Sequence, residues 1–157
     1  MQNPYVTQEL SPQKSAAAPK EAGGAARRRS TILVAEDDAD IRLMMSTLLG
    51  MKGYRVVEAS NGQEALEVVQ KERPDVVLMD LQLPRLNGFA VARFIRQSDA
   101  LSRTPIVVVS AHDPAKHRNL ALAAGCNAYV QKPIDFDRLN ELIVSLLPQE
   151  RTQKSER

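Results

Sequence analysis

Residues 32–38 read Ile-Leu-Val-Ala-Glu-Asp-Asp, in which four apolar side chains are followed directly by three acidic ones. Two later segments repeat the pattern: residues 75–79 lead to Asp80, and residues 105–109 lead to Ser110. Near-continuous apolar runs of this length are typical of strands that are buried on both faces, as in parallel sheets. The three segments therefore predict central strands of a parallel sheet, each with polar residues at its end.

Segments with apolar residues at helical spacing separate these predicted strands. Asn61 with Glu64 forms a capping-box pattern, and Asp113 followed by proline is typical of a helix start. The chain then alternates strand and helix five times, which predicts one α/β domain with a parallel sheet covered by helices on both faces. Two weaker strands are predicted at residues 54–57 and 127–130.

The composition excludes several classes of protein. The chain has 157 residues, about one domain, with 43% hydrophobic and 25% charged residues. Cys126 is the single cysteine, which excludes an intramolecular disulfide and a multi-cysteine zinc site and fits a reducing, cytoplasmic setting. The sequence has no tryptophan and few aromatic residues, which argues against base-stacking nucleic-acid binding. No apolar run is long enough to predict insertion into a membrane.

The net charge of +2 is unevenly distributed. Residues 1–30 carry five basic and two acidic residues, and their Ala-, Pro-, Gly- and Ser-rich composition predicts a disordered basic extension. Residues 148–157 carry three basic and two acidic residues and are predicted to form a polar tail. Residues 31–147, the predicted folded domain, therefore have a net charge of −2.

The polar residues at the predicted strand ends suggest a phosphoryl site. Carboxyl ends of parallel strands meet at one edge of a sheet, where ligands of such folds bind. Clustered carboxylates repel one another, and Mg²⁺ (or Mn²⁺), which prefers oxygen ligands, would relieve that repulsion. A lysine and a hydroxyl beside the metal suit a phosphoryl anion, and one carboxylate could become an aspartyl phosphate. The residues concerned are Glu36, Asp37, Asp80, Ser110 and Lys132.

The sequence resembles the receiver domains of bacterial two-component response regulators, in particular the stand-alone, chemotaxis-regulator-like members. Four motifs carry the resemblance, which spans residues 31–147, and each falls at the expected strand end. The resemblance implies a flavodoxin-like, doubly wound sheet of five parallel strands in the order 2-1-3-4-5 with five helices. The motifs are residues 32–38 (ILVAEDD), 79–88 (MDLQLPRLNG), 108–111 (VVSA) and 124–133 (AGCNAYVQKP).

The resemblance also implies a role for each residue of the site. Asp80 would accept a phosphoryl group from a histidine kinase or a phosphotransfer protein. Ser110 and Tyr129 would act as switch residues, and Lys132 would bind the phosphoryl oxygens. A protein of this family is expected to catalyse its own phosphorylation and dephosphorylation, and is not expected to be an enzyme that acts on other substrates. The implied metal ligands are Glu36, Asp37, Asp80 and the backbone carbonyl of Gln82; Gln82, Ala111 and His112 would flank the phosphoryl group, and the peptide bond before Pro133 would be cis.

Some of these residues also have plain structural interpretations. Glu36 and Asp37 could be acids that merely favour a helix start, but Asp38 fits that capping role better. Cys126 is expected to be a small buried apolar residue, and Tyr129 could simply pack as a half-buried aromatic. His112 and His117 are expected to be separate surface residues.

Several functional alternatives follow from the same sequence. About ten residues follow the last predicted helix, which favours a stand-alone receiver over one with an output domain; a fragment of a larger regulator or hybrid kinase is the alternative. A phosphatase of the haloacid-dehalogenase type is rejected, because that family places a second aspartate two residues after the nucleophile, where this chain has Gln82. An adaptor or DNA-associated protein could use the arginines at 27–29. Downstream proteins are expected to dock on the fourth helix, fifth strand and fifth helix, and the chain is expected to be a monomer or a phosphorylation-dependent dimer.

Overall fold

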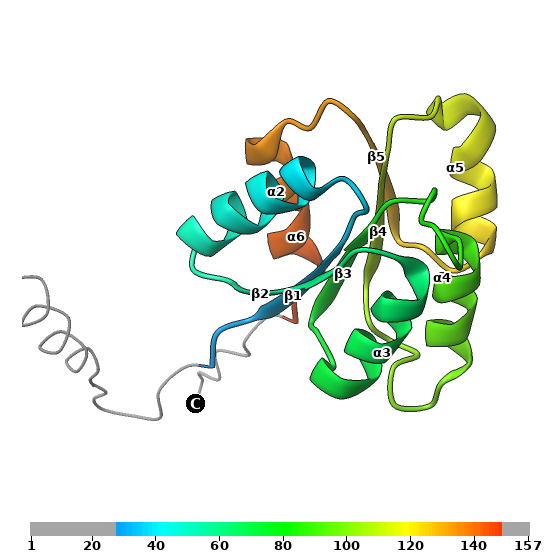
Figure 1. Ribbon diagram of the computed structural model, residues 1–157, viewed down its shortest axis with the longest axis horizontal. Helices are drawn as coiled ribbons and strands as arrows, with labels where there is room; N and C mark the ends of the chain where they lie inside the picture. Colours follow the sequence, from blue (N-terminus) through cyan, green and yellow to red (C-terminus); the bar gives the residue numbers. More distant parts are fainter. Residues whose placement is uncertain (1–27, 149–157) are drawn as a thin grey trace, which may run out of the picture.

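The computed structural model describes residues 28–148 as one parallel sheet with helices on both faces (Figure 1). The strand order is β2-β1-β3-β4-β5, and every neighbouring pair is parallel. The predicted fold class and strand order are therefore confirmed. The strands are β1 (Thr31–Ala35), β2 (Arg55–Ala59), β3 (Val76–Met79), β4 (Ile106–Ser110) and β5 (Ala128–Gln131).

Five helices connect or follow these strands. Each begins after a residue whose side chain accepts a hydrogen bond from a backbone N–H of the first turn, which satisfies donors that lack a partner within the helix. These capping residues are Asp38, Asn61, Asn87, Asp113 and Asp135. The helices are α2 (Ala39–Met51), α3 (Gly62–Glu72), α4 (Gly88–Gln97), α5 (Pro114–Ala123) and α6 (Phe136–Leu146).

Alternating side chains of the strands divide the core into two halves, because successive residues of a strand point to opposite faces. On one face, Leu33 and Val77 pack with apolar residues of α3, α4 and α5. On the other face, Ile32 and Val76 pack with apolar residues of α2 and α6. β1, β3 and β4 are buried along their whole length, which explains their continuous apolar sequences.

The predicted weak strands are shifted along the chain. β2 runs over Arg55–Ala59 rather than 54–57, and β5 over Ala128–Gln131 rather than 127–130. Both strands lie at the edges of the sheet and are only partly buried, so their apolar pattern is less regular. The ends of β2 and β5 are determined by their pairing with β1 and β4. The sequence pattern does not encode this register.

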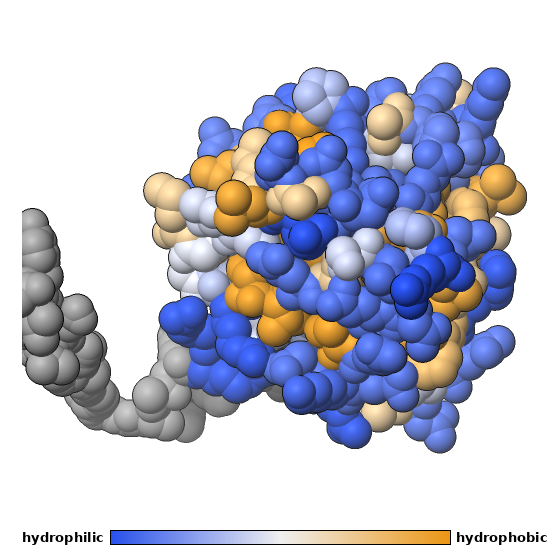
Figure 2. Space-filling model, viewed as in Figure 1, coloured by the Kyte–Doolittle hydropathy of each residue, from blue (hydrophilic) through white to orange (hydrophobic). Residues whose placement is uncertain are grey.

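The surface shown in Figure 2 is mainly hydrophilic, with some apolar side chains gathered over α2. Large exposed apolar residues of α2 are Leu43, Met44 and Met51. Within residues 28–148 no helix is long and apolar enough to cross a membrane. The predicted basic extension (1–30) and polar tail (148–157) lie outside the described residues, except for residues 28–30 and Pro148.

Candidate functional site

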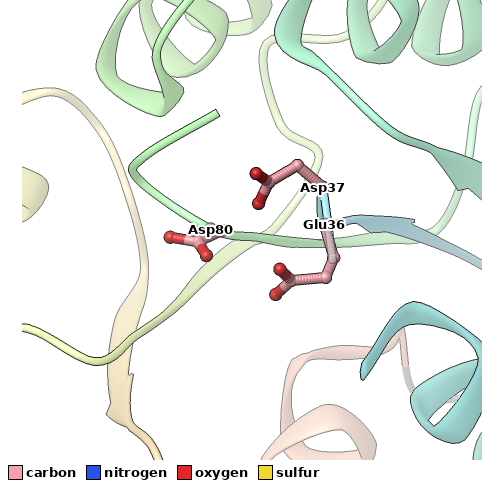
Figure 3. Close-up of side chains that lie close together, drawn as sticks. All are labelled: Glu36, Asp37 and Asp80. Atoms are coloured by element: carbon pink, nitrogen blue, oxygen red, sulfur yellow. The ribbon is translucent and has the colours of Figure 1, made fainter. Parts of the chain in front are cut away.

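Three carboxylates converge at the carboxyl edge of the sheet. Glu36 and Asp37 follow β1, and Asp80 follows the neighbouring β3, where Ala35 and Met79 are register partners. One oxygen of each carboxylate lies within 4.8 Å of the other two, and Figure 3 shows the three side chains gathered around one space. Glu36 is buried, Asp80 is half-buried and Asp37 is exposed, so the cluster opens to solvent on the Asp37 side.

Lys132, which follows β5, neutralises part of this negative charge. Its Nζ lies 2.8 Å from Glu36 Oε1 and 3.1 Å from Asp80 Oδ2. Burial raises the pKa of Glu36, and the hydrogen bonds from Lys132 and the Asp38 amide offset only part of the rise. Burial alone lowers the pKa of Lys132, but its contacts with Glu36 and Asp80 outweigh burial and raise it overall. Lys132 is therefore a firmly protonated cation in the cluster.

Backbone amides fix the orientation of two of the carboxylates. The N–H of Gln82 donates to Asp80 Oδ1 at 3.0 Å, and the N–H of Asp38 donates to Glu36 Oε2 at 3.1 Å. Lys132 holds the other oxygen of each carboxylate. Asp80 is thus held from both sides by donors. The Lys132–Pro133 peptide bond is cis.

Ser110 and Tyr129 meet at the backbone of His112. Ser110 is fully buried at the end of β4, and its Oγ accepts the N–H of His112 at 3.1 Å. The hydroxyl of Tyr129 in β5 donates to the carbonyl of His112 at 2.9 Å. Both side chains are therefore hydrogen-bonded to the same residue of the loop between β4 and α5.

His112 and His117 are not separate surface residues, contrary to the sequence-based expectation. Both are half-buried, and their ring centroids lie 4.7 Å apart. Five positions separate them in the sequence, across the start of α5, so helical spacing alone does not reveal the contact. The two rings line a cavity of about 490 Å³ beside the cluster, together with Asp37, Leu81, Gln82, Leu83, Pro84, Asn87 and Phe89.

Comparison with known proteins assigns a family to this arrangement. Residues 32–144 match the family model of the response regulator receiver domain. The chain belongs to this family. It is 33% identical over 116 residues to the polar-differentiation response regulator DivK of Brucella anthropi, which covers 74% of this chain and 94% of DivK.

Solved receiver domains have the same fold. Chemotaxis response regulator CheY4 of Vibrio cholerae superposes with a TM-score of 0.71 at 30% identity, over 76% of this chain and 100% of CheY4. The receiver domain of the sensor histidine kinase PA1611 from Pseudomonas aeruginosa gives 0.71 at 30% identity, over 76% and 98%, and carries a magnesium ion coordinated in its active-site cleft. Other relatives are longer: a probable transcriptional regulator ycf27 of Guillardia theta is 38% identical over 124 residues, which is 79% of this chain and 47% of that protein.

The donor set of this receiver domain fits a hard divalent cation. Three carboxylates with oxygens within 4.8 Å of one another are ligands of the type that Mg²⁺ prefers. The exposed side of Asp37 leaves room for the waters that Mg²⁺ usually retains.

Arg42, in the first turn of α2, was not found from the sequence. Its Nη1 donates to the backbone carbonyl of Glu36 at 2.7 Å, and its Nε lies 3.3 Å from Glu58 Oε1. A basic residue in the first turn of a helix interacts unfavourably with the helix dipole. This unfavourable position is the only signal in the sequence that sets Arg42 apart.

Cys126 agrees with its structural interpretation. It is 4% exposed, and burial raises its pKa to about 11, so its thiol is inert at neutral pH.

Proposed function

We propose that this receiver domain is a phosphorylation-dependent switch that accepts a phosphoryl group on Asp80. The observation that carries the proposal is the placement of the Asp80 carboxylate between the Gln82 amide and Lys132, beside two further carboxylates. A carboxylate that is anchored at both oxygens and faces a solvent-open cluster is pre-positioned as a nucleophile. The donor would be a phosphohistidine of a sensor kinase or phosphotransfer protein.

In the transfer, an oxygen of Asp80 bonds to phosphorus as the bond between phosphorus and the imidazole nitrogen breaks. The imidazole leaves with the bonding electron pair and is protonated. Lys132, already 3.1 Å from Asp80, stays beside the new group and binds one of its oxygens. Glu36, Asp37, Asp80 and the Gln82 carbonyl would hold Mg²⁺, which supplies positive charge against the phosphoryl oxygens.

The phosphoryl group would then be lost to water. Water attacks phosphorus, the bond between phosphorus and the Asp80 oxygen breaks, and inorganic phosphate leaves while the carboxylate is restored. Gln82, Ala111 and His112 flank the path of that water. Gln82 and His112 line the cavity beside the cluster, which supports this assignment.

The switch would act through Ser110 and Tyr129. Once Asp80 carries a phosphoryl group, the Ser110 hydroxyl turns to donate to it, and the contact between Ser110 and the His112 amide is lost. Tyr129, bonded to the same residue, moves with it. The affected surface is formed by α5, β5 and α6, where the exposed Leu120, Leu122 and Val144 offer apolar contacts to a downstream partner.

The test is intact-mass spectrometry after incubation with Mg²⁺ and acetyl phosphate. The wild type is expected to gain one phosphoryl group, and Asp80→Asn to gain none, because the amide is not a nucleophile. Asp99→Asn, an exposed acid of the loop before β4, is the matched control and should behave like the wild type. Phosphorylation of Asp80→Asn at the wild-type level would contradict the proposal.

A further inference from the structure

Arg42 connects α2 to the loop that carries two of the three carboxylates. Its side chain is 20% exposed and bonds with two acceptors: the Glu36 carbonyl at 2.7 Å and the Glu58 carboxylate at 3.3 Å. Glu58 lies on β2, so the guanidinium is held between the acidic loop and a neighbouring strand. This is a charge-assisted hydrogen bond to the backbone of a loop that has no regular structure.

The bonded carbonyl controls the direction of Asp37. The carbonyl of Glu36 and the amide of Asp37 belong to one planar peptide unit, so fixing the carbonyl fixes the backbone that leads into Asp37. Among residues 28–148, no donor forms a hydrogen bond with the Asp37 carboxylate, in contrast to Glu36 and Asp80. The position of this carboxylate therefore depends on its backbone more than on side-chain contacts.

Other contacts hold the neighbouring residues of the loop but not this peptide unit. The Glu36 amide donates to the Ala59 carbonyl at 3.0 Å, and the Asp80 amide donates to the Ala35 carbonyl at 3.0 Å. These bonds fix the loop on the β1 side of Glu36. On the other side, the Asp38 amide donates to Glu36 Oε2 and the Asp38 carboxylate caps α2. Arg42 holds the peptide unit between these two sets of contacts, where Asp37 begins.

We infer that Arg42 is a positioning residue for the metal site: it orients the peptide before Asp37, and thereby the Asp37 carboxylate, for a divalent cation. The inference rests on the proposed function, which assigns Mg²⁺ to this cluster. Groups that orient metal ligands commonly change metal affinity by a large factor although they do not touch the ion.

The charge of Arg42 and its positioning role make opposite predictions. A nearby positive charge repels Mg²⁺, so removal of that charge alone would make Mg²⁺ bind more tightly. Loss of the bond to the Glu36 carbonyl frees Asp37 and would make Mg²⁺ bind more weakly. The sign of the change therefore separates positioning from simple electrostatics.

The experiment measures Mg²⁺ binding to the unphosphorylated protein by calorimetry and by amide chemical shifts during titration. Arg42→Gln is expected to weaken Mg²⁺ binding by about tenfold. In phosphorylation with acetyl phosphate, the Mg²⁺ concentration for half-maximal rate should rise by the same factor while the rate at saturating Mg²⁺ changes little. If Arg42 had only a structural role, the substitution would lower the melting temperature but would not raise the Mg²⁺ concentration needed for the half-maximal rate.

Arg55→Gln is the matched control. Arg55 lies on β2 and, like Arg42, is paired with an acid, Glu72 at 2.7 Å, but it forms no hydrogen bond or ion pair with the acidic loop in the part of the chain that the structure describes. The substitution changes the net charge by the same amount, and Mg²⁺ affinity should stay at the wild-type value.

Mg²⁺ affinity in Arg42→Gln equal to or higher than in the wild type would overturn the inference. If Arg42→Gln does not fold, Arg42→Lys replaces it: the ammonium keeps the charge but lacks the planar fork that reaches both acceptors, and an unchanged affinity would again overturn the inference. Failure of the wild type itself to bind Mg²⁺ would instead contradict the proposed function.

Discussion

At the scale of single residues, the site depends on close backbone contacts as much as on charged side chains. Gly62, the first residue of α3, packs against the Leu86 carbonyl in the loop between β3 and α4. Gly88, the first residue of α4, packs against the carbonyl of Asp80 itself. Side chains at these positions would push against the backbone of Asp80 and of the loop that follows it. The two glycines therefore let the loop after Asp80 fold close to the sheet.

Gly62→Ala is expected to lower the free energy of unfolding by about 1–3 kcal/mol, because the new methyl group collides with the Leu86 backbone and the loop must shift. Urea unfolding followed by far-UV circular dichroism measures the change. Gly50→Ala is the control: Gly50 lies in α2 with open space around it, and alanine should stabilise the helix there by about 0.5–1 kcal/mol. Equal effects of the two substitutions would contradict this interpretation.

The sequence located those residues of the site that are charged and that come shortly after a predicted strand. Glu36, Asp37, Asp80 and Lys132 were predicted to meet because they follow strands, and the structure brings them together. The contact of Arg42 with this site was missed because it is a bond to a backbone carbonyl, which no side-chain pattern shows. The contact between His112 and His117 was missed for a related reason, since it depends on how the loop enters α5.

At the scale of single elements, the start of α3 shows how local hydrogen bonds set a helix. Asn61 Oδ1 accepts the N–H of Glu64 at 2.8 Å, as the capping-box pattern predicted. Glu64 Oε1 accepts the amide of Ser60 at 2.6 Å and its hydroxyl at 2.9 Å, one residue earlier than the usual partner. These bonds lower the pKa of Glu64 below its ordinary value of 4.5.

This pKa shift predicts a pH dependence of stability. Because the charged carboxylate is favoured in the folded state, its contribution is fully present above pH 4.5 and is lost as the pH falls through the lowered pKa. Glu64→Gln is expected to cost about 1 kcal/mol at pH 7 and to flatten the fall in stability below pH 4.5. Urea midpoints between pH 7 and pH 3 test both effects. Glu67→Gln, at an exposed position of the same helix, removes the same charge and should leave the urea midpoint at pH 7 at the wild-type value.

Elements differ in how well the sequence predicted them. α4 has clear local signals in its sequence, because Asn87 caps its start and its apolar face is regular. β2 and β5 were shifted, because partly buried edge strands carry a weaker alternation and take their ends from pairing with neighbours. Local signals thus located the helix starts, while the strand ends depended on contacts between distant segments.

At the scale of the whole molecule, the fold forces like charges together. β1 and β3 are neighbours in the sheet, so their terminal acids converge whatever the metal content. Lys132 alone does not balance three carboxylates, and their mutual repulsion opposes folding. A cation bound only by the folded state would therefore stabilise the entire domain.

Mg²⁺ at one hundred times its dissociation constant is expected to raise the free energy of unfolding by about 2.7 kcal/mol. Chemical unfolding in Mg²⁺ and in EDTA measures the difference. Asp37→Asn should lose most of this gain and, in EDTA, be at least as stable as the wild type, because one repelling charge is removed. A wild-type midpoint that does not respond to Mg²⁺ would argue against a metal site at this cluster.

The ends of the described domain offer a practical advantage. β1 begins at Thr31 on the amino edge of the sheet, and α6 runs back from the carboxyl edge and finishes at Leu146 near the same side (Figure 1). The length of β1, roughly 16 Å, separates that edge from Glu36. A fluorescent reporter or a surface tether fused beyond either end would thus leave the carboxyl edge clear for incoming proteins, so the domain could be labelled or immobilised for single-molecule work.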